Sequence, residues 1–187
     1  MSAASPPTLR EALVLFRSSN GLNTDETART SWVCRFGPVA LHLPNFGWRR
    51  KAIEAHDLHH VLTDYPCTMS GECQVATWEF AAGNMPHWAA SLFCLPLVLV
   101  GFLYAPHRTF LAFIAGRQSR SLHGLELSEQ LLGSPLHKVR ADLASKAEMG
   151  GRWLNYLRFA LLVLKSGTIS LLPLALVIGL WVALRAK

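Results

Sequence analysis

Two histidines and an aspartate lie close together in the sequence, as His56, Asp57 and His60, and Glu72 follows them. The pattern around these residues predicts a helix, in which each residue advances by about 100°. His56 and His60 then differ by only about 40°, and Asp57 lies about 100° from His56. Imidazole nitrogens and carboxylate oxygens gathered in this way suit a zinc or iron ion. The spacing therefore predicts a metal site.

One helix face cannot surround an ion, so a further ligand has to come from another element. Glu72 opens a second predicted helix, 71–82, after a turn that contains Pro66. It can therefore face back toward the first helix. Glu79 lies on the same side of the second helix as Glu72 and can orient a metal ligand by accepting a hydrogen bond from it.

Other proteins use similar residue patterns, and two histidines on a helix are often only surface residues. The H-x-x-H-H pattern from His56 to His60 also occurs in di-iron hydroxylases, but such a site needs several histidine boxes. The remaining histidines are isolated in the sequence: His42, His87, His107, His123 and His137. An HD-type phosphohydrolase would add a distant histidine and aspartate, for which only the unmarked His123 and Asp142 are available. Both alternatives are disfavoured.

The segment resembles the metal motif of the Coq-four family of ubiquinone (coenzyme Q) biosynthesis proteins, in which eleven residues separate H-D-x-x-H from a glutamate. The flanking segments G-E-C-Q-V-A-T-W-E-F and, at 134–143, S-P-L-H-K-V-R-A-D-L are similar as well. The similarity spans about 32–143. It implies a mainly helical fold and a divalent metal ion, zinc in preference to iron, cobalt or manganese. The implied ligands are His56, Asp57, His60 and Glu72.

The same resemblance implies an enzyme that removes the ring carboxylate of a prenylated aromatic precursor of ubiquinone and hydroxylates the same carbon. Such a metal-dependent oxidative decarboxylase binds its lipid substrate close to a membrane. His59 and Glu79 are the candidates for proton transfer, although a solvent-facing His59 without a chemical role is the favoured interpretation. The alternative is a non-catalytic prenyl-lipid-binding or scaffolding protein. Expected partners include other quinone biosynthesis enzymes and a second copy of the chain.

The rest of the sequence indicates a mainly α-helical, compact domain. A short amphipathic helix is predicted from Leu9 to about Ser18, followed by a small β-hairpin whose strands cover 32–36 and 39–43. A helix over 48–62 precedes the one at 71–82. We expect residues 1–149 to form the metal- and lipid-binding domain. Residues 150–187 are expected to form a separate interfacial helix and membrane anchor.

Two long stretches, 80–107 and 166–184, contain no Asp, Glu, Lys or Arg, and they account for most of the reason why only 16% of the chain is charged. Pro96 divides the first, so a buried, an interfacial and a membrane-spanning helix all remain open at 88–105. The second would be about 28 Å long as a helix, close to the roughly 30 Å of a bilayer core. It is therefore expected to be a C-terminal anchor, preceded by an interfacial helix over 152–164.

The net charge of +6 comes from scattered or flanking lysines and arginines, so we expect contact with anionic lipids and no nucleic-acid partner. The four cysteines form no C-x-x-C pair, which favours a reducing compartment. Cys67 and Cys73 are expected to pack as small apolar residues rather than to bind zinc. The N-terminus resembles neither a secretory signal nor a transit peptide. The expected location is the cytoplasmic face of a bacterial inner membrane, with the mitochondrial inner membrane as the alternative.

Overall fold

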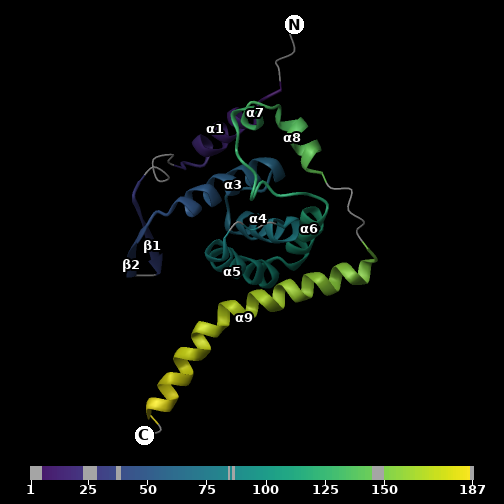
Figure 1. Ribbon diagram of the computed structural model, residues 1–187. Helices are drawn as coiled ribbons and strands as arrows, with labels where there is room; N and C mark the ends of the chain where they lie inside the picture. Colours follow the sequence, from purple (N-terminus) through teal and green to yellow (C-terminus); the bar gives the residue numbers. More distant parts are fainter. Residues whose placement is uncertain are drawn as a thin grey trace.

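The computed structural model describes residues 6–22, 29–36, 39–83, 85, 87–144 and 150–185. The elements in chain order (Figure 1) are α1 (Leu9–Ser19), β1 (Ser31–Phe36), β2 (Val39–Pro44), α3 (Gly47–Thr63), α4 (Met69–Ala82), α5 (Trp88–Tyr104), α6 (Pro106–Arg117), α7 (Glu129–Leu132), α8 (Leu136–Leu143) and α9 (Arg152–Arg185). The described chain is mainly helical with one small two-stranded sheet, which confirms the predicted mainly α-helical class and its small hairpin.

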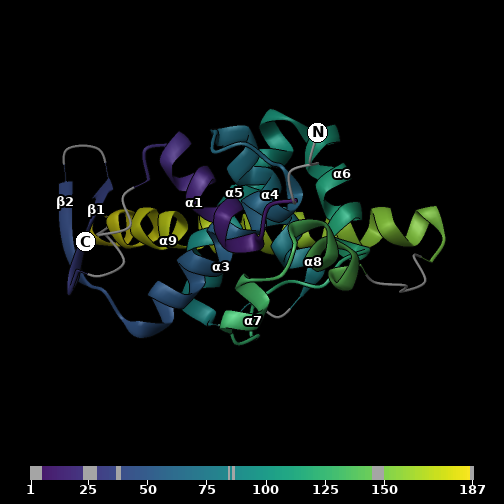
Figure 2. The same ribbon diagram turned by 90° about the horizontal axis from the view of Figure 1, so that it is seen from above.

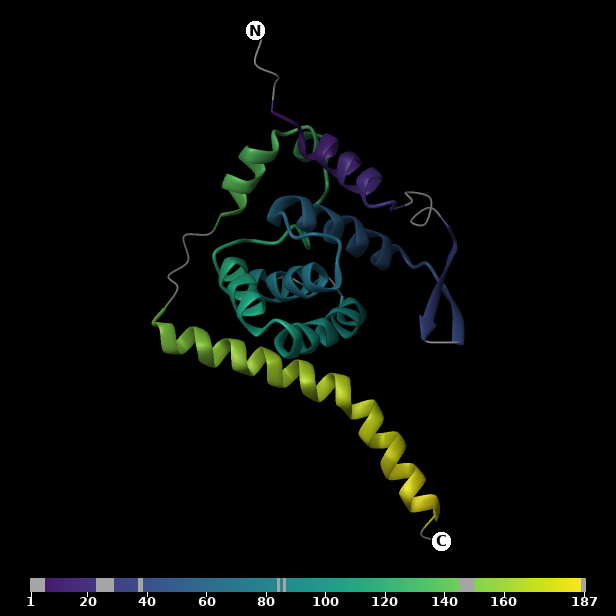
Figure 3. The ribbon, with the colours of Figure 1, turned by 180° about the vertical axis from the view of Figure 1, so that it is seen from behind.

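The predicted hairpin is confirmed as an antiparallel pair in which Trp32 lies opposite Leu43. It stands at one side of the helical body, beyond the start of α3 (Figure 3). The Trp32 ring packs edge-on against Phe93 of α5, with 6.0 Å between the ring centroids. The Arg49 guanidinium of α3 lies 3.9 Å from the centre of the same Trp32 ring, at a distance typical of a cation–π contact. The hairpin is thereby attached to both α3 and α5.

Helix α1 begins at a capping box. The Glu11 backbone N–H donates to the Thr8 hydroxyl, and the Thr8 backbone N–H donates to the Glu11 carboxylate. Its apolar face then lies against α3. The two helices share a core with the loop after α6 and with α7 and α8, formed by buried Leu9, Leu13, Leu58, Val61, Leu62, Leu122, Leu132 and Val139. This core fixes one side of α3, the helix that carries the candidate histidines.

The turn between α3 and α4 is tight. Helix α3 ends at Thr63 and is capped by Asp64, which has a left-handed conformation and accepts a 2.6 Å hydrogen bond from Arg140 of α8. Helix α4 begins after Thr68, whose side chain accepts a hydrogen bond from the backbone of Gly71. A Cβ atom on Gly71 would lie 1.8 Å from the carbonyl oxygen of Pro66, so only glycine allows this close approach. The turn consequently places the first residues of α4 beside the last turns of α3.

Helices α4, α5 and α6 form a second layer below α3 (Figures 1 and 2). Helix α6 can approach α4 closely because Gly116 has no Cβ atom. A Cβ atom there would lie only 2.4 Å from the carbonyl oxygen of Trp78. The side chains buried in this layer are Cys73, Val75, Ala76, Trp78, Leu95, Val98, Ala112 and Phe113. Since α4 lies between α3 and α6, packing holds both elements that contribute to the candidate site.

The segment expected to be an interfacial helix and an anchor is one continuous helix, α9, whose first part runs along α5. Phe159 is buried against Phe110 and Phe113 of α6. The buried Ser166 hydroxyl donates to the carbonyl oxygen of Leu95 and accepts a 3.1 Å hydrogen bond from the backbone N–H of Leu99. In a regular helix these two α5 groups would bond to each other. Helix α9 therefore packs tightly onto α5 and α6.

Among the residues whose side chains the structure describes, no helix is long and apolar enough to cross a membrane. The expected C-terminal anchor therefore has no support from the structure, and the side chains of its larger part, 173–184, lie outside the described residues. Helix α5 covers the other candidate span, 88–105. It is 17 residues long and packs against α4, α6 and α9.

Candidate metal centre

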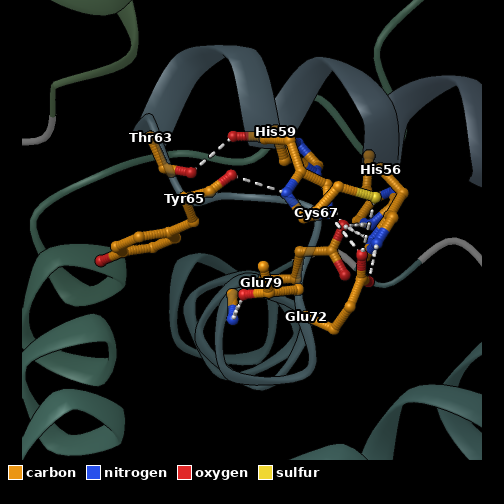
Figure 4. Close-up of polar contacts among 11 residues, drawn as sticks. His56, His59, Thr63, Tyr65, Cys67, Glu72 and Glu79 are labelled. Carbon is orange, nitrogen blue, oxygen red and sulfur yellow. Dashed lines mark hydrogen bonds and ion pairs between the residues drawn. The ribbon is translucent and has the colours of Figure 1, made fainter. Parts of the chain in front are cut away.

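Helix α3 contributes His56 and His60, and helix α4 contributes Glu72, to one group of potential ligands. Their ligand atoms all lie within 4.8 Å of one another. The His56 Nε2 atom is 3.1 Å from Glu72 Oε2, and the His60 Nε2 atom is 3.3 Å from Glu72 Oε1. Figure 4 shows Glu72 reaching across from α4 toward His56 on α3. The tight turn after α3 thus brings the carboxylate between two imidazoles, as the spacing predicts.

The orientation of His60 leaves its Nε2 atom available as a metal ligand. The other ring nitrogen, Nδ1, is 2.9 Å from the carbonyl oxygen of Tyr65. A carbonyl oxygen only accepts, so Nδ1 carries the proton and Nε2 keeps its lone pair in the neutral ring. That Nε2 atom is buried and has no hydrogen-bond partner. His60 Nε2 and the Glu72 carboxylate therefore face each other with their lone pairs, which repel. A divalent cation between them would remove this repulsion.

His56 lies between two carboxylates. Its Nδ1 atom is 3.1 Å from Glu79 Oε1, while its Nε2 atom faces Glu72. Burial lowers the pKa of His56, but Glu79 and Glu72 outweigh burial and raise the pKa to about 10. Burial raises the pKa of Glu72, but the hydrogen bond from His56 and the charge of that ring outweigh it and hold that pKa well below its usual range. A proton on His56 therefore balances the charge in the absence of an ion.

Metal binding is expected to release about one proton per ion at about pH 8, because the ion takes the lone pair of His56 Nε2 and the raised pKa of His56 keeps that atom protonated before binding. Affinity should then rise about tenfold per pH unit until the pH reaches the pKa of His56, about 10. Calorimetric titration with zinc in two buffers of different ionisation enthalpy measures the proton count. A count of zero would contradict the placement of the ion at His56.

Asp57 takes a different position from the other three predicted ligands. Its Oδ2 atom is 2.8 Å from both Nε and Nη2 of Arg17 in α1, so it links α1 to α3. It is absent from the group formed by His56, His60 and Glu72. Coordination by Asp57 stays a prediction, and in the structure the visible role of this carboxylate is to hold α1 in place.

The two cysteines near the ligands differ in their surroundings. Cys73 is almost fully buried and packs in the core of α4, as expected of a small apolar residue. The Cys67 thiol points at the site and lies 3.5 Å from Glu72 Oε1. Burial and the nearby Glu72 carboxylate raise the pKa of Cys67, so it is a neutral thiol at neutral pH. A neutral thiol that donates to the carboxylate fits a supporting role.

A second buried group lies directly behind the first and consists of His59, Glu79 and His123. The Glu79 Oε1 atom is 2.7 Å from His59 Nδ1 and 3.2 Å from His123 Nε2, and it is also the atom that contacts His56. His59 is fully buried, so the interpretation of it as a solvent-facing residue is wrong. Its side chain lies between α4 and the loop after α6, because the backbone N–H of Leu122 donates to His59 Nε2 over 2.8 Å.

In this second group the Glu79 carboxylate is charged and the His59 ring is neutral. Burial lowers the pKa of His59 despite the opposing effect of Glu79, so its ring is neutral. Burial raises the pKa of Glu79, but the charge of His56 and hydrogen bonds from His123, His56 and His59 hold it well below the usual value. Glu79 is therefore a buried carboxylate surrounded by imidazoles, one of which is a candidate metal ligand.

A cavity of about 240 Å³ lies beside the two groups. Apolar side chains, mostly from α3 and α5, form most of its wall, and His56, Glu79 and His123 of the two groups also line it. It is lined by Trp48, Arg49, Ala52, Ile53, His56, Glu79, Met85, Ala90, Phe93, Cys94, Leu97 and His123. A mostly apolar cavity with a few polar groups is the usual form of a small-molecule site.

A family model described as coenzyme Q (ubiquinone) biosynthesis protein Coq4 matches residues 49–147, which is more than half of the chain. The chain belongs to the Coq4 family. This confirms the resemblance seen in the sequence. No curated protein and no solved structure matched the chain. The Coq4 match begins in α3 and ends before α9, so it contains both groups of potential ligands but not the hairpin or the long C-terminal helix.

Within the Coq4 segment, no sequence pattern marks His123 as a site residue. It stands alone between Leu122 and Gly124, outside any repeated spacing of histidines, and it was expected to be an isolated residue. The structure places its imidazole against Glu79, with ring centroids of His123 and His59 only 4.7 Å apart. The loop that carries His123 is joined to α3 by the hydrogen bond to His59. Only the fold brings this residue to the site.

Proposed function

We propose that this Coq4 protein is a metal-dependent enzyme of ubiquinone biosynthesis that acts on a prenylated aromatic acid. The reaction replaces the ring carboxylate by a hydroxyl group with loss of carbon dioxide. This is a two-electron oxidation, so it needs an oxidant from solution, such as dioxygen. The observation that carries the proposal is the pair of Nε2 atoms of His56 and His60 directed at Glu72 beside an apolar cavity.

Each residue of the site has a part in this proposal. His56, His60 and Glu72 would hold the divalent ion, and Asp57 is the proposed fourth ligand. Zinc is favoured because nitrogen and carboxylate ligands suit it, as they do iron, cobalt or manganese. When bound there, the ion would supply a Lewis acid at the substrate carboxylate or an adjacent ring oxygen. The apolar wall keeps water away from the ring.

The size of the cavity supports the proposal that it holds only the ring end of the substrate. About 240 Å³ accommodates an aromatic ring with its substituents better than a long prenyl chain. Phe93 and Leu97 of α5 line the cavity, and Phe93 and Trp88 are largely exposed on the same helix. We propose that the ring enters the cavity while the prenyl tail lies over the exposed apolar side chains of α5.

The exposed surface of α5 and α9 supports binding to a membrane surface. Large exposed apolar residues include Trp88, Leu103, Tyr104, Trp153, Leu157, Leu161 and Leu164. Basic residues lie among them at Arg108, Arg152 and Lys165. Aromatic and apolar side chains insert between lipid headgroups, and basic side chains bind anionic ones. We propose that the protein works at the cytoplasmic face of an inner membrane, where it can take up a prenylated substrate.

The direct test is an assay of full-length protein loaded with zinc, cobalt, iron or manganese, in vesicles containing anionic phospholipid. The substrate is a prenylated hydroxybenzoic acid labelled with ¹⁴C at the carboxyl carbon. We expect labelled carbon dioxide to be released and mass spectrometry to find a ring hydroxyl in place of the carboxylate. Release should fall at least about tenfold in Glu72→Ala and stay unchanged in the exposed control Glu126→Ala. Saturable binding of the substrate without release under any of these metals would instead support the non-catalytic lipid-binding or scaffolding alternative.

A further inference from the structure

The group His59, Glu79 and His123 is too costly to be explained by packing alone. Three imidazoles contact one oxygen of a buried carboxylate, while the other oxygen, Glu79 Oε2, has no hydrogen-bond partner. His123 Nδ1 is also buried without a partner. An incompletely satisfied polar network inside a protein is less stable than apolar residues of the same shape. The cost suggests that the network does something for the neighbouring site.

The hydrogen bonds fix the direction of the network. The backbone N–H of Leu122 donates to His59 Nε2, so this nitrogen has the lone pair and His59 Nδ1 has the proton. His59 Nδ1–H therefore donates to Glu79 Oε1 over 2.7 Å. Glu79 in turn is 3.1 Å from His56 Nδ1. A carboxylate can only accept, so it selects the form of His56 with a proton on Nδ1, which leaves Nε2 for the ion.

A second metal ion in this buried group is the competing explanation. It would need lone pairs from His59, Glu79 and His123 together. The Leu122 backbone occupies Nε2 of His59, and Nδ1 carries a proton, so His59 has no lone pair to offer. Only Glu79 and His123 remain in the group, and two protein ligands do not make a closed site.

The two motif histidines are oriented in different ways. His60 donates from Nδ1 to the backbone carbonyl of Tyr65, which the turn after α3 holds in position. His56 donates to a side chain, Glu79, which has to be held by something else. His59 from α3 and His123 from the loop after α6 approach that carboxylate as its other partners.

We propose that His59 and His123 are positioning residues, which hold the Glu79 carboxylate so that it orients His56 with Nε2 toward the metal ion. This inference rests on the metal site of the proposed function. It gives roles to His59 and Glu79 other than proton transfer, and it brings His123 into the site. Residues that orient a metal ligand in this way commonly change metal affinity by about 10- to 100-fold when replaced.

The test compares His123→Leu with His123→Gln in the full-length protein. Leucine removes the donor to Glu79, whereas the glutamine amide can donate from about the same position as Nε2. Zinc affinity is measured by competition with a chelator, and the visible spectrum of the cobalt-loaded protein reports the ligand geometry. We expect His123→Leu to bind zinc about 10- to 100-fold more weakly with an altered cobalt spectrum, and His123→Gln to stay within about threefold of the parent.

Circular dichroism shows whether each variant is folded. If His123→Leu does not fold, Glu79→Gln takes its place, because it keeps the side-chain volume and removes the charge; the same loss of affinity and change of spectrum are expected. Unchanged affinity and spectrum in a folded His123→Leu or Glu79→Gln protein would overturn the inference. So would two zinc ions per parent chain with one lost in His123→Gln. A parent protein that binds no metal would overturn the proposed metal site itself, which is a separate result.

Discussion

Replacing Glu72 with alanine is expected to lower the zinc affinity of the protein by at least about a hundredfold. The Glu72 carboxylate is the element that faces both imidazoles, at 3.1 Å from His56 and 3.3 Å from His60. Without it, the two histidines lie on one side of the ion only, and the ion keeps solvent on the other. Calorimetric titration of the purified variant with zinc measures the loss.

The matched control is Glu126→Ala, which removes the same charge from an exposed position. It should bind zinc as tightly as the parent protein. A Glu72→Ala protein that keeps one tightly bound zinc ion per chain would show that the ligands are elsewhere. Asp57→Asn, measured in the same titration, addresses the fourth ligand: a loss of affinity comparable to that of Glu72→Ala is expected if Asp57 coordinates the ion.

Truncation after Gly150 is expected to destroy the folded domain, although residues 150–187 look like a separate appendage in the sequence. Helix α9 buries Phe159 against α6 and inserts the Ser166 hydroxyl into the backbone of α5. Loss of a buried phenylalanine alone costs about 3–5 kcal/mol, while a domain is stable by only about 5–15 kcal/mol. Thermal unfolding followed by circular dichroism should show no cooperative transition in the truncated protein.

Point variants in α9 show whether the loss of its buried contacts accounts for this result. Phe159→Ala in the full-length protein should destabilise it by about 3 kcal/mol, whereas Leu164→Ala, at an exposed position of the same helix, should change stability by less than about 0.5 kcal/mol. A truncated protein that stays soluble, unfolds at the parent temperature and binds one zinc ion would contradict this account. It would support the separate domain expected from sequence.

The predictable part of the site is the part set by local periodicity. His56 and His60 share a face because a helix repeats every 3.6 residues, and Pro66 marks the turn that brings Glu72 back toward them. The hairpin was predictable from two short apolar runs around Gly37 and Pro38. These features depend on residues that are close in sequence, and the family resemblance points to the same four ligands.

The parts that sequence missed depend on distant residues. Asp57 is held by Arg17, which lies forty positions away in α1, and no local pattern marks that pair. His59 seemed to face solvent because its neighbours on α3 do not show what covers the helix. The loop that carries His123 covers His59. The backbone N–H of Leu122 in this loop, sixty-three positions after His59, donates to its Nε2 atom. Tertiary packing alone decides such contacts.

The apolar stretch 88–105 illustrates the same limit for membranes. A hydrophobic run can be covered by lipid or by other helices, and composition does not distinguish the two. In the structure α5 packs against α4, α6 and α9 while Trp88, Leu103 and Tyr104 stay exposed, and Ser166 satisfies backbone groups near Pro96. The long apolar helix thereby became part of the wall of the cavity.

The most direct measurement is a crystal structure of the zinc-loaded protein with anomalous diffraction data collected on both sides of the zinc absorption edge. The account predicts one anomalous peak per chain, placed between Nε2 of His56, Nε2 of His60 and the Glu72 carboxylate. A zinc-loaded crystal with its peak in the group of His59, Glu79 and His123, or with none near Glu72, would contradict it.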